Sequence, residues 1–181
     1  RVDKFFAQAF VRTQDGQIIN DGGGRPLRYN IGQFQGHGNP DWIWGINNKF
    51  SFKGLFANFA FDGRQGGVIE NYIRRQTFRG GRHIETIQGA LGEARYQDYK
   101  GAKTYLGEGV QIAIGTPKYD PVTGLITNYN ELTFKPNETK TFAQDYVSRY
   151  YSTVEGNLMK KTYAKLREVT IGYTVPQKWM K

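Results

Sequence analysis

Four stretches of the chain are rich in aromatic and β-branched residues and are bounded by Gly, Pro, Asn or Asp, a pattern that predicts β-strands. The predicted strands are residues 5–13, 41–52, 55–62 and 162–175. Two residues separate the second strand from the third, whereas residues 63–161 separate the third from the fourth. We therefore expect an all-β chain whose sheet carries one very long loop. Short turns that alternate with long loops are typical of outer-membrane barrels.

The hairpin formed by 41–52 and 55–62 has two unlike faces. If Lys53-Gly54 is a two-residue turn, Phe52 opposes Leu55 and Phe50 opposes Ala57, and opposed residues share a face. The face so defined is apolar except for one asparagine: Trp42, Trp44, Ile46, Asn48, Phe50, Phe52, Leu55, Ala57, Phe59 and Phe61. Either this face lies against lipid, or it is the buried side of a soluble sandwich; the loop pattern favours the membrane barrel.

In the fourth predicted strand the apolar alternation changes phase. Val169, Ile171 and Tyr173 share one face, whereas Ala164 and Leu166 continue the pattern one position out of step. A β-bulge between these groups would restore the alternation. Alternatively, the charged residues at the change lie near the outer rim, where lipopolysaccharide phosphates would attract Lys165 and Arg167.

The loop 63–161 carries elements of its own. Apolar residues recur at helical spacing in two places: Val68, Ile69, Tyr72 and Ile73, and then Phe142, Ala143, Tyr146, Val147, Tyr150 and Tyr151. Thr141 and Gln144 fit a capping box for the second helix. Residues 110–114 and 125–127 flank a turn at 119–124 and predict a small hairpin. A loop of this kind is usually functional or packs against a partner.

The composition of the chain limits the classes of function that it can have. The 181 residues include 23 Gly, and 15% are aromatic, which favours a β protein. Cysteine is absent, which excludes disulfides and cysteine-based metal or redox sites. We find no catalytic constellation, no metal-ligand cluster and no cofactor motif, so no enzymatic activity is expected. The net charge of +9 is assigned to a barrel rim facing anionic lipid, or to acidic groups on a partner, rather than to nucleic-acid binding.

Four motifs resemble one protein family. They are 39–42 (NPDW), 61–67 (FDGRQGG), 143–146 (AQDY) with Tyr150-Tyr151 following, and 165–176 (KLREVTIGYTVP). Each is similar to an element of the SusC/RagA-type TonB-dependent outer-membrane transporters of Bacteroidetes, and together they span residues 39–176. The last motif is the strongest and resembles a late barrel strand.

The resemblance implies a 22-stranded barrel with an N-terminal plug. It also implies nutrient uptake, namely the import of oligosaccharides or peptides driven by TonB, and a SusD-like surface lipoprotein over the extracellular mouth. The chain, 1–181, would be a partial barrel domain in the bacterial outer membrane, among lipid and lipopolysaccharide, with 63–161 as an extracellular loop. We assign no segment to the plug or to the final strands, so we expect a piece of a longer polypeptide. Four strands cannot close a barrel, and no transport is expected of them alone.

The candidate substrate-binding residues are Tyr72, Tyr146, Tyr150 and Tyr151, on the predicted extracellular helices. They either pack the loop or line a substrate cavity, where flat aromatic rings with a polar hydroxyl suit sugars or peptide side chains. An alternative function for the chain is a soluble all-β module that binds glycans on aromatic platforms.

Overall fold

The computed structural model describes residues 2–180, which form two compact units. Unit 1 contains residues 2–3, 36–69 and 160–180, and unit 2 contains residues 4–35 and 70–159. The chain is mostly β, with 39% strand and 23% helix, and within residues 2–180 its several sheets are all open. The predicted loop 63–161 therefore supplies most of unit 2, together with an N-terminal segment that the sequence pattern had not joined to it.

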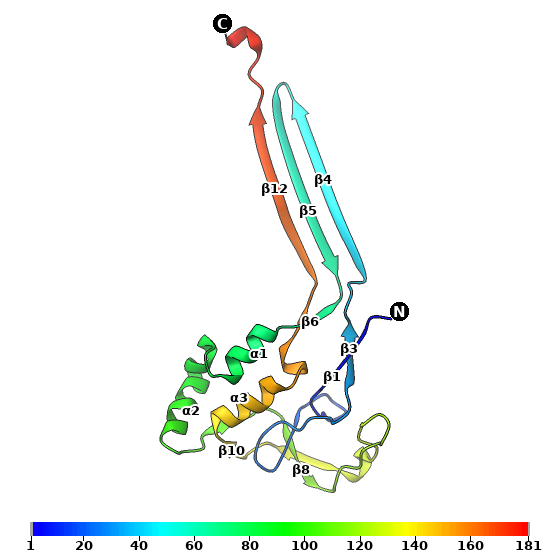
Figure 1. Cartoon of the computed structure of the whole chain (residues 1–181), viewed down its shortest axis with the longest axis vertical. Helices are drawn as coiled ribbons and strands as arrows, with labels where there is room; N and C mark the ends of the chain where they lie inside the picture. The colour runs from blue at the N-terminus through cyan, green and yellow to red at the C-terminus, as the bar shows by residue number, and fades with distance from the viewer. Residues whose placement is uncertain (1, 181) are drawn as a thin grey trace. The chain divides into compact units, whose positions relative to one another are not determined.

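Unit 1 is built on one long antiparallel sheet in the order β12-β5-β4 (Figure 1). Its strands are β4 (Trp42–Phe52), β5 (Leu55–Gln65) and β12 (Tyr163–Tyr173). The predicted register is confirmed: Phe52 pairs with Leu55, and Phe50 pairs with Ala57. Lys53 and Gly54 both adopt positive φ, at 48° and 90°. A type I′ turn, the usual connection of a two-residue hairpin, requires positive φ at both of its central residues.

Short elements complete the connections of the chain. They are β1 (Lys4–Ala7), which pairs with β3 (Gln33–His37); β6 (Val68–Glu70), which pairs with β11 (Leu158–Lys160); and η4 (Gln177–Trp179). The predicted strand 5–13 is thus regular only over its first part and lies outside the long sheet. Val68 and Ile69, expected on a helix, belong to a strand.

The core of unit 2 joins the N-terminal segment to the predicted loop. A small sheet has the order β2-β8-β9, with β2 (Ile19–Asn20) parallel to β8 (Val110–Ile114) and β9 (Thr133–Pro136) antiparallel to it. The buried side chains around it are Ala9, Val11, Ile19, Tyr29, Val110, Ile126 and Leu132. Ala9 and Val11 leave the strand pattern because this core, rather than the long sheet, buries them.

The predicted hairpin of 110–114 with 125–127 is wrong. Residues 110–114 pair with β9 instead, and Ile126 meets Tyr119 in an isolated bridge that closes the 119–124 turn. The turn itself is confirmed, since Asp120 accepts hydrogen bonds from the backbone N–H groups of Val122 (2.9 Å) and Thr123 (2.6 Å).

Helices form the other part of unit 2 (Figure 1). They are α1 (Tyr72–Arg79), α2 (Gly89–Tyr99) and α3 (Ala143–Ser152), with the short helices η1 (Ile84–Ile87), η2 (Tyr129–Glu131) and η3 (Glu155–Asn157), and the paired strands β7 (Tyr105–Leu106) and β10 (Lys140–Thr141). Both α1 and α2 pack against α3. Among residues 2–180, every helix falls short of the length and apolar character needed to cross a membrane.

The start of α3 is capped from another helix. The predicted capping box is wrong, because Thr141 lies in β10 and the residue before the helix, Phe142, offers no capping side chain. Instead the Asp98 carboxylate accepts hydrogen bonds from the backbone N–H groups of Ala143 (2.9 Å) and Gln144 (2.8 Å). This anion satisfies two otherwise unpaired donors at the positive end of the helix.

We expect Asp98→Ala to lower the free energy of unfolding by about 1 kcal/mol, as the loss of a helix cap usually does. Asp98→Asn, which keeps an acceptor oxygen, should lose less. Glu93→Ala on the same helix is the control, because Glu93 is exposed and its carboxylate accepts a hydrogen bond from Gln97 one turn further along, and it should change stability by less than about 0.5 kcal/mol. Denaturant unfolding followed by helical circular dichroism measures all three; equal effects of Asp98→Ala and Glu93→Ala would contradict the capping role.

Candidate functional site

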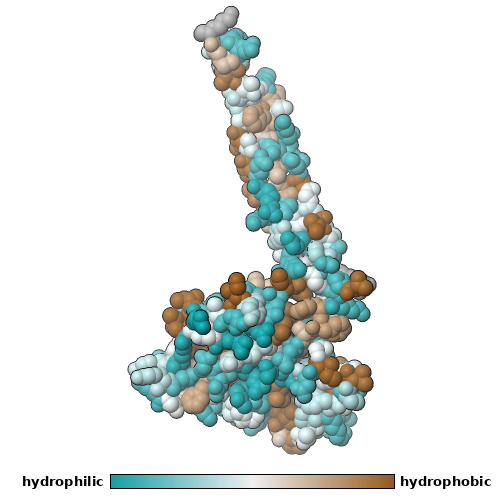
Figure 2. All heavy atoms as spheres, in the orientation of Figure 1, coloured by the Kyte–Doolittle hydropathy of each residue, from teal (hydrophilic) through white to brown (hydrophobic). Residues whose placement is uncertain are grey.

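The long sheet of unit 1 has one apolar face that the described residues leave uncovered. The third strand, β12, adds apolar residues to those predicted on β4 and β5, namely Ala164, Leu166, Val169, Ile171 and Tyr173. Many of these side chains are more than half exposed, with Phe52 at 71% and Ile171 at 69%. Figure 2 shows hydrophobic residues at the surface along this sheet. Exposed apolar surface of this extent marks a membrane or protein interaction site.

A β-bulge keeps the apolar face continuous along β12. Leu166 pairs with Phe61 and Val169 pairs with Phe59, with the register shift between Leu166 and Glu168. Both residues therefore lie on the apolar face although they are three positions apart. Of the two explanations for the phase change, the bulge is confirmed, with Arg167 as its extra residue.

The opposite face of the sheet is polar and internally bonded. Asp62 accepts hydrogen bonds from both Arg167, through Nε and Nη2, and the Tyr163 hydroxyl (2.9 Å). Further along the same face, Glu168 accepts from Asn58 (3.2 Å) and Thr170 (2.7 Å). On this face Asp62 is thus paired with Arg167, and Glu168 is satisfied by neutral donors, so both carboxylates have hydrogen-bond partners on a face that can meet water or a polar ligand.

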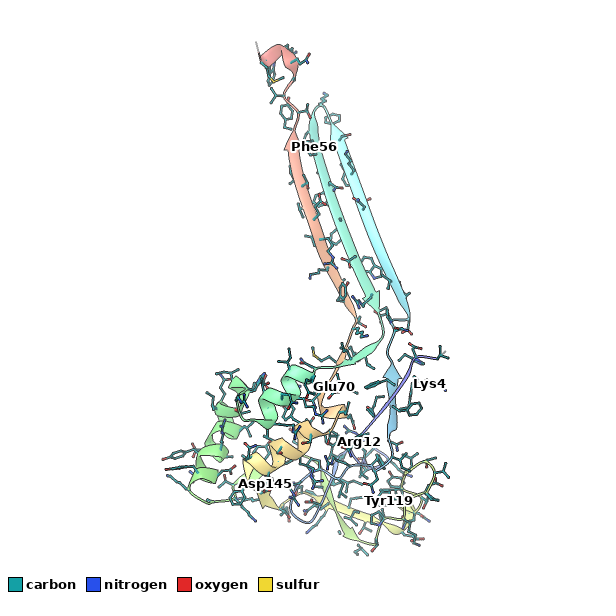
Figure 3. All side chains as sticks on the ribbon, in the orientation of Figure 1. Lys4, Arg12, Phe56, Glu70, Tyr119 and Asp145 are labelled. Carbon is teal, nitrogen blue, oxygen red and sulfur yellow. The ribbon has the colours of Figure 1, made fainter. Side chains whose placement is uncertain are left out.

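A shallow depression of about 540 Å³ lies on the polar face. It is lined by Asn47, Lys49, Phe56, Asn58, Glu168 and Thr170. Phe56, labelled in Figure 3, lies over Gly172, where an added Cβ would come within 2.2 Å of the ring. On the apolar face Trp44 covers Gly63 in the same way, at 2.4 Å. An aromatic ring therefore fills the space over a glycine on each side of the sheet.

Three of the four candidate tyrosines come together in unit 2. Tyr146 is 6% exposed and packs against Tyr105, with ring centroids 4.9 Å apart. The remaining ring contacts are Tyr146–Tyr150 (6.0 Å), Tyr150–Tyr151 (5.1 Å), Phe10–Tyr150 (4.8 Å) and Phe78–Tyr151 (3.8 Å). This aromatic cluster joins α3 to α1 and to the N-terminal segment.

Tyr72 lies apart from this cluster. It is 58% exposed, and its hydroxyl accepts a hydrogen bond from the Gln76 side chain one helical turn further on. Tyr72 is the candidate with the most freely accessible ring, whereas Tyr146 is part of the interior. Substrate binding by the four residues stays a prediction.

Burial sets the protonation of the clustered tyrosines. It raises the pKa of Tyr146, Tyr150 and Tyr151 above the ordinary value, because the ionised phenolate loses hydration in the packed cluster. The hydroxyls therefore stay neutral at physiological pH and can donate hydrogen bonds, but they are poor bases or nucleophiles.

The two histidines serve local structure. His83 stacks on Phe78 at 4.0 Å, and its Nδ1 accepts from the Glu85 N–H at 3.3 Å. His37 Nδ1 lies 3.2 Å from an Asp3 carboxylate oxygen. Across residues 2–180, the structure brings together no group of three or more His, Asp or Glu side chains that could hold a metal ion.

The Asp62–Arg167 pair was not predicted from the sequence. The two residues are 105 positions apart, and the pair follows only once the bulge is placed at Arg167 and β12 is registered against β5. The apolar phase change was the signal that could have located it.

No protein-family model matches the chain, and no curated protein is significantly similar to it. The family resemblance of the four motifs therefore stays a prediction. The two unlike faces of the unit 1 sheet are the structural feature from which function can be argued.

We expect Tyr146→Ala to lower the free energy of unfolding of unit 2 by about 3–5 kcal/mol, because it removes a buried ring and leaves a cavity. Tyr72→Ala is the matched control on an exposed surface and should change it by less than about 0.5 kcal/mol. Denaturant unfolding followed by helical circular dichroism distinguishes the two. A Tyr146→Ala effect as small as that of Tyr72→Ala would contradict an interior role for Tyr146.

Proposed function

We propose that the long sheet of unit 1 is a section of a transmembrane β-barrel wall in a bacterial outer membrane, and that the chain is part of a TonB-dependent importer of the SusC/RagA type. The observation that carries the proposal is the division of this sheet into an uncovered apolar face and a polar face. In a barrel wall the first would meet lipid and the second the aqueous lumen.

The strand length suits a bilayer. Each of the three strands has 11 residues, which at ~3.3 Å per residue gives roughly 36 Å of extended chain. At a tilt of about 45°, such a strand rises about 25 Å, the height of the apolar band on outer-membrane barrels.

Aromatic residues mark both ends of the apolar face. Trp42 and Trp44 lie at the end where β4 begins, and Phe52 and Tyr173 lie at the end with the tight turn. Tryptophan and tyrosine favour the lipid headgroup region, where an apolar ring and a polar atom are both solvated. Two aromatic levels at about one bilayer thickness support a spanning orientation over a one-sided contact.

The proposal requires further strands at both edges of the sheet. Among residues 2–180, no strand pairs with the outer edge of β4 or of β12. Unpaired backbone N–H and C=O groups are very costly in a bilayer, and only a closed barrel removes them. A larger barrel of the kind that the motifs resemble would supply the missing neighbours.

The orientation assigns a place to unit 2. In such barrels, tight turns lie on the periplasmic side and long loops outside, so Lys53-Gly54 would be periplasmic and residues 70–159 extracellular. There unit 2 would contact an oligosaccharide or peptide substrate, or the SusD-like lipoprotein. TonB would act through a plug to which none of these residues belongs.

A soluble glycan-binding module is the second candidate function. The separate buried core of unit 2 favours it, since a unit with its own core can fold without a bilayer. On this reading the exposed ring of Tyr72, rather than the buried ring of Tyr146, would serve as an aromatic platform.

Lysine substitutions on opposite faces of β12 test the barrel. Val169→Lys, halfway along the apolar face, should lower the stability of the membrane-inserted protein by about 2–4 kcal/mol, as expected at a bilayer midplane. Thr170→Lys, its neighbour on the polar face, is the control and should cost less than about 1 kcal/mol. Both are measured as folding of the intact protein into lipid vesicles.

Equal effects of the two lysines would contradict a lipid-facing sheet. So would recovery of the unmodified chain as a compact monomer in buffer without detergent, the outcome that the soluble module predicts.

A further inference from the structure

A cavity of about 480 Å³ lies entirely within unit 2 and is separate from the tyrosine cluster. Its walls come from Gln8, from residues 27–31, from the 119–124 turn and from α3. Figure 3 labels Tyr119 on the turn. The volume suits a small organic ligand of the size of a sugar ring or a dipeptide.

Two arginines line this cavity without a carboxylate partner. Arg28 and Arg149 are half-buried, and no Asp or Glu of residues 2–180 forms an ion pair with either. Some arginines of the unit are paired with carboxylates, such as Arg12 with Glu155 at 2.7 Å and Arg75 with Glu70 at 2.9 Å, and the half-buried Arg95 donates to the Gly81 carbonyl and the Thr86 hydroxyl instead. Burial, and then repulsion from Arg149, lower the pKa of Arg28. The two like charges therefore lie close enough to repel each other, and no ion pair with a carboxylate of residues 2–180 relieves that repulsion.

The residues that line the cavity carry a net positive charge that a ligand with one negative charge would neutralise. Its one lining carboxylate is Asp120, whose Oδ1 is held by the backbone N–H groups of its own turn and by the Thr123 hydroxyl (3.0 Å). Two arginines and one aspartate leave a net charge of +1, by adding the formal charges of these lining residues. A monoanion neutralises this charge, whereas a phosphate dianion would overcompensate it and face Asp120.

A second hollow of about 290 Å³ shares the same two arginines. Asp145 and Arg25 also line it, and Arg25 is already paired with Asp21 at 3.2 Å. Asp145 forms no ion pair with Arg28 or Arg149 among the described residues. Arg28 and Arg149 thus line both hollows, and the larger offers room for the body of a ligand.

The remaining walls of the larger cavity suit an organic carboxylate better than a bare ion. Leu27 and Ile31 contribute apolar surface, Tyr119 an aromatic ring, and Asn30 an amide that can donate and accept. We propose that this cavity binds the carboxylate group of a small ligand through the guanidinium groups of Arg28 and Arg149, with the ligand body against Tyr119 and Leu27. Planar guanidinium groups bind carboxylates through paired hydrogen bonds, which gives orientation as well as affinity.

This chemistry fits a sugar acid or the C-terminal carboxylate of a peptide. The site lies within unit 2, so binding can be measured whether or not unit 1 spans a bilayer. Failure of carboxylate binding would leave the membrane assignment intact, and failure of the lysine test would leave this site intact.

The test is a calorimetric titration of the full chain in detergent with two carboxylates and their neutral counterparts: glucuronate against glucose, and N-acetyl-dialanine against its amide. We expect at least one carboxylate to bind, and its neutral counterpart to bind at least about tenfold more weakly. Binding of glucuronate alone identifies a sugar acid, and binding of N-acetyl-dialanine alone identifies a peptide terminus.

Arg149→Gln and Arg28→Gln should each weaken the carboxylate that binds by about tenfold or more. Arg82→Gln, on the exposed surface away from the cavity, is the matched control and should leave binding unchanged, and helical circular dichroism verifies that each variant is folded. The proposal is overturned if neither carboxylate binds, if the neutral counterparts bind as well, if inorganic phosphate binds more tightly than both carboxylates, or if both arginine variants bind like the control.

Discussion

The hydrophobic effect poses the central constraint on this protein, because the long sheet of unit 1 presents an apolar face that nothing in the described chain covers. A soluble protein would bury such a face beneath a second layer. A bilayer solves the same problem without one. The bulge at Arg167 keeps the apolar face continuous. It places Leu166 and Val169 on the same face and leaves one residue unpaired.

The polar face follows from the same division. The charged side chains lie on the face opposite the apolar one. There Asp62 is hydrogen-bonded to Arg167, and Glu168 is hydrogen-bonded to Asn58 and Thr170. Unit 2 follows a different rule, with its own buried core, a helix capped by Asp98, and a packed aromatic cluster. The chain thus combines a sheet whose apolar face is left uncovered with a unit that buries its own core, and within that unit Arg28 and Arg149 line the cavity proposed to bind a ligand.

Local pattern predicted the sheet well and the packing of unit 2 poorly. The two-residue turn and strict alternation fix the register of 42–65, because a slip by one residue would exchange the faces. The bulge was one of two explanations that the pattern left open. By contrast, three features depend on contacts between segments far apart in sequence. They are the strand that pairs with residues 110–114, the burial of Ala9 and Val11 in the core of unit 2, and the cap that Asp98 provides. The sequence around Arg28 and around Arg149 did not predict the cavity, because the two residues come together only in the folded chain.

The most direct measurement of the membrane account is spin-label accessibility along β4. The chain has no cysteine, so single cysteines at positions 46 to 50 can each carry a label in the intact, membrane-embedded protein. The account predicts strict alternation: labels at 46, 48 and 50 relax with oxygen dissolved in lipid, and labels at 47 and 49 relax with a water-soluble nickel complex. Equal access of the nickel complex to all five positions, or burial of 46 and 50 from both reagents, would contradict it.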